Sequence, residues 1–261
     1  MNTRPPITTI TQQHIGWWNN LPELWQKIFC LALYQPDIIE MRLLEDYSSE
    51  FIANDDKFGV DEGIYILNYS PVLRDINDLL NLFKVKQIVF DRELNPSSDT
   101  VVTFIPPMRY FTELEFLSLN YNYLKDISNL SSLTTLKSLS LCECFTIDDY
   151  SPIANLTNLV ELELGFNGIK DICFVENLTE LRHLYLPGNR IANISAISGL
   201  AKLITLDLGS SPIRDVRPLA KLIKLQELSM GTDEPTLTGE FDYTHVKWLK
   251  EQLSNTDIDV Y

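Results

Sequence analysis

The side chains with catalytic or metal-binding chemistry lie close together in the middle of the chain. His183 is a potential general base, Cys142 a potential nucleophile, and Glu161 and Glu163 are carboxylates that could orient such a base. Cys142 and Cys144 also have the spacing of two zinc ligands, but no second CxxC or histidine pair supplies the other two. We therefore predict no metal and no cofactor. Whether the other side chains can act together depends on the elements that carry them.

Composition argues against several further classes of function. The 261 residues include 21 Lys+Arg and 36 Asp+Glu, a net charge of −15, which disfavours binding to nucleic acid or to an anionic membrane surface. The 10 glycines are scattered, whereas a phosphate-binding loop needs a cluster of them. We find no signal peptide and no apolar stretch of membrane-spanning length. With four widely spread cysteines, we expect a reduced, cytoplasmic setting.

A repeat organises the middle of the chain. Leucines recur at intervals of 22, 23, 22, 22 and 22 residues, namely Leu114, Leu136, Leu159, Leu181, Leu203 and Leu225. The first five open units with apolar residues at positions 1, 4 and 6, a small side chain at position 9, and mostly apolar residues at positions 11, 14, 17 and 20. Positions 4 and 6 alternate with polar neighbours, as in a strand with one buried face. The later spacing of three favours a short helical or 3₁₀ return.

Such a unit cannot bury its leucines alone, so we expect the units to stack and their strands to form one parallel sheet. These repeats, with returns such as Asp126–Leu130 and Asp215–Leu219, resemble those of leucine-rich repeat proteins of the 22-residue class, in particular the bacterial, internalin-like variety. The resemblance implies an α/β fold, a right-handed solenoid with a concave parallel sheet. It also implies protein binding on that sheet and no catalysis.

The regularity of the pattern sets the predicted extent of the array. We predict regular repeats over 114–232 and degenerate repeats over 61–113. The degenerate part contains an expected strand at 85–90, followed by a polar insertion at 94–100. An earlier strand is expected at 64–66.

An open solenoid exposes an apolar edge at each end, so both ends need a cap. Residues 1–60 are the predicted helical N-terminal cap, with an amphipathic helix for which Asn20 is the N-cap. Residues 233–261 are the predicted C-terminal cap, with a helix over 243–253 and a short strand over 258–261.

The repeat register predicts which side chains point outward from the sheet. Exposed aromatic residues beside charged ones are typical of a binding hot spot. The predicted protein-binding residues of the concave face are Phe116, Tyr121, Glu161, Glu163, Phe166, Arg182, His183 and Tyr185. A flat sheet offers no pocket that excludes water and the register supplies no oxyanion donors, so we predict that the protein is not an enzyme.

The sequence thus favours a monomeric, non-catalytic scaffold that binds an unidentified protein partner. Two alternatives remain open. A surface adhesin or virulence-type module would need an export route. The segment Leu21–Phe29 also has a weak similarity to an F-box, which would make the protein a substrate receptor of a ubiquitin ligase.

Overall fold

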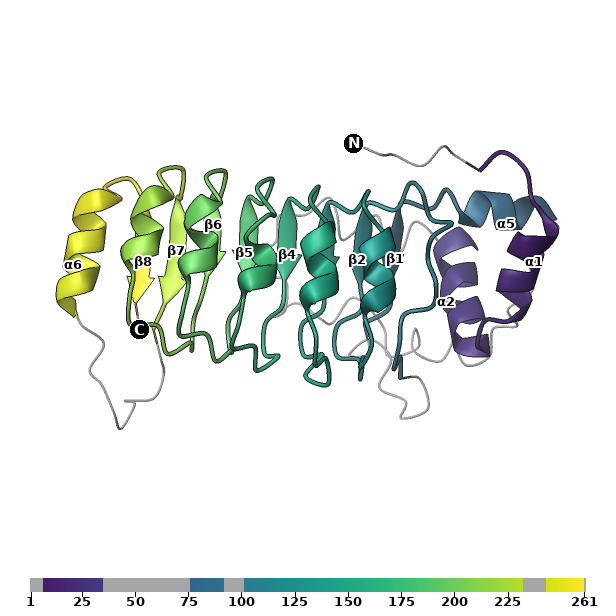
Figure 1. Cartoon of the computed structure of the whole chain (residues 1–261), viewed down its shortest axis with the longest axis horizontal. Helices are drawn as coiled ribbons and strands as arrows, with labels where there is room; N and C mark the ends of the chain where they lie inside the picture. The colour runs from purple at the N-terminus through teal and green to yellow at the C-terminus, as the bar shows by residue number, and fades with distance from the viewer. Residues whose placement is uncertain (1–6, 35–75, 92–100, 232–242, 261) are drawn as a thin grey trace, which may run out of the picture.

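The computed structural model describes residues 7–34, 76–91, 101–231 and 243–260, and it shows an open array of repeats with helices at both ends (Figure 1). In these described ranges, eight strands form one parallel sheet in which the spatial order follows the chain order. The strands are β1 (Gln87–Val89), β2 (Phe116–Ser118), β3 (Ser138–Ser140), β4 (Glu161–Glu163), β5 (His183–Tyr185), β6 (Thr205–Asp207), β7 (Glu227–Met230) and β8 (Asp257–Val260). The predicted leucine-rich repeat solenoid is confirmed.

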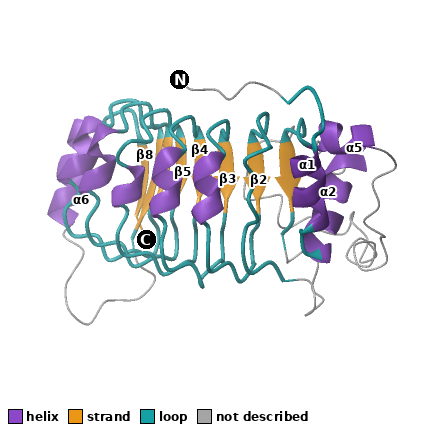
Figure 2. Cartoon of the chain, turned by 45° about the vertical axis from the view of Figure 1, so that its right-hand side comes forward, coloured by secondary structure: helices purple, strands orange, loops and turns teal. Residues whose placement is uncertain are grey.

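Short helical returns lie on the opposite side of the array from the sheet (Figure 2). Among the described residues, five of them are 3₁₀ helices: η4 (Ser128–Ser132), η5 (Ser151–Asn155), η6 (Cys173–Val175), η7 (Ser195–Gly199) and η8 (Arg217–Lys221). The return that precedes β1 is instead an α-helix, α5 (Ile76–Leu82). Apolar positions spaced by three fit the three-residue turn of a 3₁₀ helix, which explains why the regular units adopt it.

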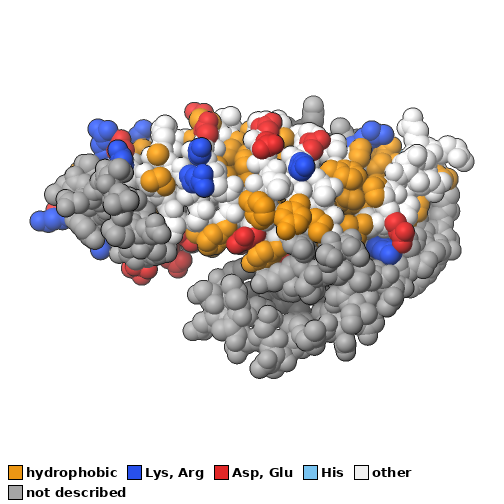
Figure 3. All heavy atoms as spheres, turned by 90° about the horizontal axis from the view of Figure 1, so that it is seen from below, with side chains coloured by type: hydrophobic (Ala, Val, Ile, Leu, Met, Phe, Trp, Pro, Cys, Tyr) orange, Lys and Arg blue, Asp and Glu red, His pale blue; other side chains and the backbone are white. Residues whose placement is uncertain are grey.

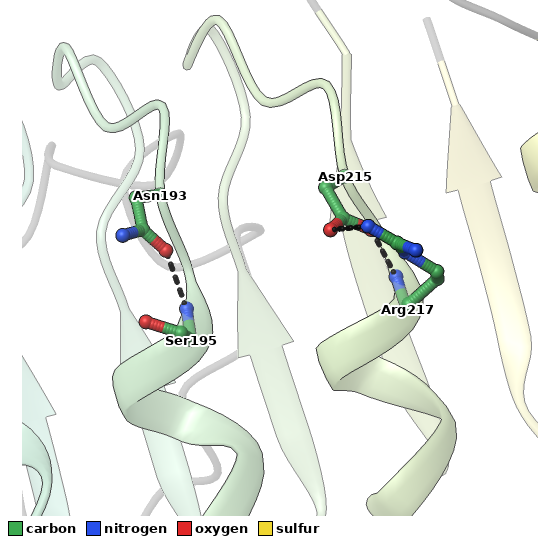
Figure 4. Close-up of polar contacts among 4 residues, drawn as sticks. All are labelled: Asn193, Ser195, Asp215 and Arg217. Carbon is green, nitrogen blue, oxygen red and sulfur yellow. Dashed lines mark hydrogen bonds and ion pairs between the residues drawn. The ribbon is translucent and has the colours of Figure 1, made fainter.

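An Asp or Asn two residues before each 3₁₀ helix fixes where the return begins. The side chains of Asn193 and Asp215 accept hydrogen bonds from the backbone N–H groups of Ser195 (2.9 Å) and Arg217 (3.0 Å) (Figure 4). The same bond from Ser128 lowers the pKa of Asp126. These bonds satisfy donors at the start of a helix that have no partner within it.

Leucines of successive units stack to form the core. The central residues of six neighbouring strands lie opposite one another and are 0–2% exposed: Leu117, Leu139, Leu162, Leu184, Leu206 and Leu228. Burial of one such side chain contributes about 1.5–3 kcal/mol. Strands of three or four residues are therefore held mainly by the leucines beneath them.

The side chain at position 9 bonds the backbone where the chain leaves each strand. Asn189 is 3% exposed, and its Nδ2 donates to the carbonyl oxygens of Leu164 (2.9 Å) and Leu186 (2.9 Å). Its Oδ1 accepts from the N–H groups of Asn167 (3.2 Å) and Ile169 (2.9 Å) of the preceding unit. Asn189 thereby joins two consecutive turns through both ends of its amide.

The 23-residue unit interrupts this ladder. Asn167 keeps its donor bonds to Leu141 and Leu164, but its buried Oδ1 has no hydrogen-bond partner. The residue that corresponds to Ile169 in the preceding unit is Ile147, and its N–H donates to the carbonyl of Cys144 instead. The extra residue of that unit therefore redirects a backbone donor and leaves one acceptor of Asn167 unpaired.

Within residues 7–34, two helices rather than one close the N-terminal end. These are α1 (Gln12–Asn19) and α2 (Glu23–Tyr34), and the prediction that Asn20 is an N-cap was wrong. Asn20 is the C-cap of α1, and its Nδ2 donates to the carbonyl of Gly16 (2.6 Å). The sequence pattern joined the tryptophans before Asn20 to the helix after it, because both segments contribute apolar side chains to the same cluster.

The helices α1 and α2 cover the apolar edge of the array. Trp17 and Trp25 donate through Nε1 to the carbonyls of Pro107 (2.7 Å) and Phe104 (3.0 Å). The ring of Phe29, which is fully buried, lies 5.0 Å from that of Phe111. The helices therefore bury apolar surface of the array and satisfy backbone acceptors in it.

The C-terminal cap adds a strand to the sheet. Helix α6 (Tyr243–Gln252) precedes β8, which pairs with β7 in the parallel register of the repeats. The predicted helix and strand are both present there. The strand expected at 64–66 and the insertion at 94–100 lie outside the described residues, and the boundaries of the caps stay predictions.

The buried leucines allow a direct test of the repeat register. Leu164→Ala removes a fully buried side chain, so we expect a loss of about 2–5 kcal/mol in the free energy of unfolding. Lys170→Ala, on an exposed turn of the same unit, is the matched control and should change it by less than about 0.5 kcal/mol. Chemical denaturation measures both, and equal stabilities would contradict the register.

The position-9 ladder predicts unequal costs for two similar substitutions. Asn189→Ala leaves buried donors and acceptors of two units unpaired and should destabilise by about 2–4 kcal/mol. Asn167→Ala should cost clearly less, because Oδ1 of Asn167 already has no partner. Thermal melts of the two variants compare these costs directly, and the opposite order would show that the ladder is assigned wrongly.

Candidate protein-binding face

The sheet presents two rows of side chains away from the leucine core, and we call these rows the concave face. The first row contains Gln87, Phe116, Ser138, Glu161, His183, Thr205, Glu227 and Asp257. The second contains Val89, Ser118, Ser140, Glu163, Tyr185, Asp207, Ser229 and Asp259. Neighbouring strands lie about 4.8 Å apart, so adjacent members of a row can contact one another.

Four of the predicted binding residues meet on β4 and β5. Glu161 lies opposite His183 and Glu163 lies opposite Tyr185, and all four side chains are half-buried. Arg182 directly precedes β5 and is exposed. The structure therefore brings together carboxylates, a histidine and a tyrosine on two neighbouring strands.

Phe116 is a correction to the predicted site. It occupies the expected row position between Gln87 and Ser138, but its side chain is only 8% exposed. The next residue of the same face on β2, Ser118, is only 3% exposed. The repeat register predicts the direction in which a side chain points but not which residues cover it. Phe116 is therefore not accessible to a partner at this end of the face.

Tyr121 and Phe166 lie just beyond the strands, on the turns that leave them. Both have left-handed backbone conformations, with φ of 61° and 58°. Phe166 is 55% exposed and Tyr121 36%. The equivalent residue of the next unit is Gly188, and a Cβ built there would overlap the Phe166 ring. The ring of Phe166 therefore lies over a residue that has no side chain.

Two exposed aromatic residues beside them were missed by the sequence analysis. The rings of Tyr123 and Phe145 form an edge-to-face pair with centroids 5.6 Å apart, and Phe145 is 57% exposed. Both occupy position 10 of their repeat units, which lies after the strand, and the predicted binding face did not include that position. Seen from below, the molecule displays clustered hydrophobic side chains with charged ones among them (Figure 3).

A continuous chain of polar contacts crosses the first four strands of the concave face. Ser118 Oγ donates to Oδ1 of Asp91 (2.7 Å), and Nδ2 of Asn120 donates to Ser118 Oγ (3.1 Å). Ser140 Oγ lies 2.8 Å from Oδ1 of Asn120 and 2.6 Å from Oε2 of Glu163. The repeat register places these residues on one face, but only the distances show that they are connected.

The environment of this chain changes the proton affinity of several groups. Burial, together with the charges of Glu161 and Asp91, raises the pKa of Glu163 to about 7, although the hydrogen bond from Ser140 acts in the other direction. Burial and nearby carboxylates raise the pKa of Tyr185 to about 12. Burial and the charge of Glu163 raise the pKa of Cys142 to about 12, so its thiol stays protonated at neutral pH.

These features do not assemble a nucleophile with its base. Cys142 follows β3 and His183 is on β5, two strands or about 10 Å away, which is beyond hydrogen-bond reach. His183 Nδ1 instead lies 3.2 Å from Thr205 Oγ1. The thiol of Cys144 lies in the position-9 ladder, 3.2 Å from the carbonyl oxygen of Leu119. Within the described ranges, no three His, Cys, Asp or Glu side chains are grouped to hold a metal, and no helix is long and apolar enough to cross a membrane.

Comparison with known proteins agrees with this architecture. Residues 179–221 match the family model described as leucine-rich repeats in two copies. A search of curated proteins finds no match. Residues 179–221 therefore carry leucine-rich repeats, and the fold is that of an internalin-like leucine-rich repeat solenoid.

The similar solved structures give the extent of the likeness. Internalin C2 from Listeria monocytogenes is 23% identical with a TM-score of 0.53, over 71% of this chain and 83% of that chain. Internalin F from the same bacterium is 25% identical with a TM-score of 0.47, over 72% of this chain and 59% of that one. The plant peptide hormone receptor RGFR1, solved in complex with RGF2, is 21% identical with a TM-score of 0.45, over 59% and 25%. The likeness to internalin C2 establishes the fold.

The contact between Phe166 and Gly188 can be tested with a second glycine as the control. Gly168→Ala adds a Cβ in a left-handed conformation with open space around it, and should cost about 1–2 kcal/mol. Gly188→Ala has the same backbone cost and also displaces the Phe166 ring, so we expect a larger loss of stability.

A double-mutant cycle separates the two contributions. In a Phe166→Ala background, Gly188→Ala should cost no more than Gly168→Ala does. Urea denaturation of the four proteins of the cycle and of Gly168→Ala supplies the numbers. Strict additivity of Gly188→Ala and Phe166→Ala would contradict the packing of the ring on Gly188.

Proposed function

We propose that the protein is a non-catalytic scaffold that holds a protein partner on the concave face and the adjoining aromatic turns. A leucine-rich repeat fold is in general a protein-binding scaffold. One observation carries the finer assignment: an exposed aromatic ring, Phe166, stands directly beyond β4, the strand on which half-buried Glu163 lies opposite Tyr185.

The composition of this surface supports the proposal. Aromatic side chains bury large apolar areas at a small cost in conformational entropy, and they are enriched in binding hot spots. Tyr121, Tyr123 and Phe145 extend the apolar surface along the same turns. Glu161 and Arg182 place charges beside it, which is the arrangement expected of a hot spot with a polar rim.

The packing of the N-terminal helices supports a capping role over an F-box-like role. The α2 side chains Trp25, Ile28 and Phe29 are at most 2% exposed, so the helix uses its apolar face inside this molecule. No observation favours the adhesin alternative. A cytoplasmic, monomeric protein remains our prediction, and cell fractionation with size-exclusion chromatography tests it.

Partner capture from native lysate tests the proposed face. Full-length wild type should retain a partner that the Phe166→Asp/Tyr185→Asp variant loses, because charge replaces the aromatic anchors. The matched control is Ala201→Asp/Ile223→Asp, which adds two carboxylates at exposed positions that precede the strands. This control should retain the partner as the wild type does.

Circular dichroism melts show whether all three chains are folded alike. Retention of the same protein by wild type and by the aromatic double variant would place binding elsewhere on the molecule. Loss of the partner from both double variants would attribute the effect to added charge alone. Either result contradicts the proposed face.

A further inference from the structure

The hydroxyl of Ser140 has one hydrogen and two close oxygen neighbours. Its Oγ lies 2.8 Å from Asn120 Oδ1 and 2.6 Å from Glu163 Oε2, and a third, much longer contact of 3.9 Å reaches Cys142 Sγ. A hydroxyl can donate its hydrogen to one oxygen while it accepts from another. If Asn120 Oδ1 takes the hydrogen, the contact with Glu163 needs a proton on the glutamate.

The orientation of the Asn120 amide is fixed independently. The backbone N–H of Cys142 donates to Asn120 Oδ1 at 2.6 Å, so this atom must be the oxygen. Nδ2 of Asn120 faces two acceptors, Ser118 Oγ at 3.1 Å and Asp91 Oδ2 at 3.4 Å. A flipped amide would point its NH₂ group at a backbone donor, so the assignment follows from the hydrogen bonds alone.

With a proton on Glu163, all four hydrogen bonds of the polar chain then run in one direction, from Glu163 to Asp91. A protonated Glu163 donates to Ser140, Ser140 donates to Asn120, Asn120 donates to Ser118, and Ser118 donates to Asp91. The chain begins at a neutral carboxyl on β4 and ends at a carboxylate that follows β1. Asp91, Ser118 and Ser140 are all less than 10% exposed.

We propose that Glu163 is a pH-operated switch in the concave face. As a neutral acid it donates to Ser140 and completes the polar chain to Asp91. When it loses its proton, its carboxylate takes the Ser140 hydrogen, and Asn120 Oδ1 loses that donor. One step therefore adds a negative charge to the face and disconnects Glu163 and Ser140 from the part of the polar chain on the first two strands.

The charges around Glu163 favour the neutral form near neutral pH. Among the described residues, Glu161 is on its own strand, Asp91 follows β1, and the Cys142 thiol follows β3. On β5 its neighbours are Tyr185, directly opposite, and His183, one row away. Asp207 lies beyond Tyr185 on β6. No lysine or arginine occupies either row of the concave face as described, so no fixed cation in these rows offsets the carboxylates.

The switch has a definite sign in folding stability. The folded-state pKa of Glu163 is about 7, above its ordinary value of 4.5, so the folded protein holds this proton more tightly than the unfolded chain does. The stabilisation is fully present below pH 4.5 and is lost as the pH rises through about 7. Glu163→Gln keeps a neutral side chain and should flatten this part of the pH profile.

NMR titration of the side-chain carboxyl carbons in the full-length, ¹³C-labelled protein tests the switch without any partner. We expect one glutamate to titrate near pH 7, and its signal should be absent in Glu163→Gln. Glu161→Gln should lower that midpoint, because it removes a neighbouring negative charge. Ser140→Ala should shift it, because it removes the hydroxyl that bonds Glu163 in both protonation states.

Thermal melts at each pH confirm that the variants remain folded. A Glu163 midpoint near the ordinary glutamate value would overturn the switch. An unchanged midpoint in both Glu161→Gln and Ser140→Ala would also overturn it, because the proposed network would then have no influence on the proton.

Regulation of binding by this switch rests on the proposed function and needs the captured partner. Glu163→Gln at pH 8 should retain the partner to the same extent as the wild type does at pH 6, because both carry a neutral side chain there. Wild-type retention should differ between pH 6 and pH 8. Equal wild-type retention at the two pH values would contradict regulation of binding.

The two proposals can fail separately. Titration of Glu163 near pH 7 with no captured partner would contradict the scaffold proposal and leave the switch in the fold. Partner capture that depends on Phe166 and Tyr185, with Glu163 titrating at its ordinary value, would overturn the switch and support the scaffold.

Discussion

The stacking of leucines under very short strands is the constraint on which the rest of this structure depends. Strands of three or four residues make too few backbone bonds to be stable alone, so each unit needs the leucines of its neighbours. The requirement applies to positions 1, 4 and 6 and to the returns. It leaves positions 3 and 5 free, and these are the positions that form the concave face. Core and candidate site are therefore encoded by different residues of the same strand.

Most of the fold could be predicted because the core requirement repeats. The interval between leucines predicted parallel strands, and the spacing of three predicted the 3₁₀ returns. The caps have no such repetition, and there local pattern misled: Asn20 was assigned to the start of one helix when it ends another. The unpaired Oδ1 of Asn167 could not be predicted either. It results from the extra residue of the preceding unit, where the N–H of Ile147 donates to the carbonyl of Cys144 instead.

The candidate site was only partly predictable, for a related reason. Register gives the direction of each side chain, and it correctly placed Glu161, Glu163, His183 and Tyr185 side by side. It cannot give solvent access, and Phe116 is buried although its row position is right. It also cannot give hydrogen-bond direction. The chain from Glu163 to Asp91 joins residues 72 positions apart, and its polarity follows from the backbone N–H of Cys142, which identifies the oxygen of the Asn120 amide.

The second row of the concave face changes from small polar side chains to larger ones between β3 and β5. Ser118 and Ser140 are small enough for hydrogen bonds to pass from strand to strand beneath the surface. At the next position Glu163 is the last side chain of that path, and the residue opposite it on β5 is Tyr185. Glu163 thus has polar partners on one side and a large ring on the other. The carboxyl group of Glu163 is largely shielded from water at this position, and the charge of Glu161 lies nearby. Burial is the largest cause of the raised pKa of Glu163. In a repeat protein, such a site forms where an acidic residue has a small neighbour in its row on one side and a large neighbour on the other. The leucine core beneath the row does not need to change.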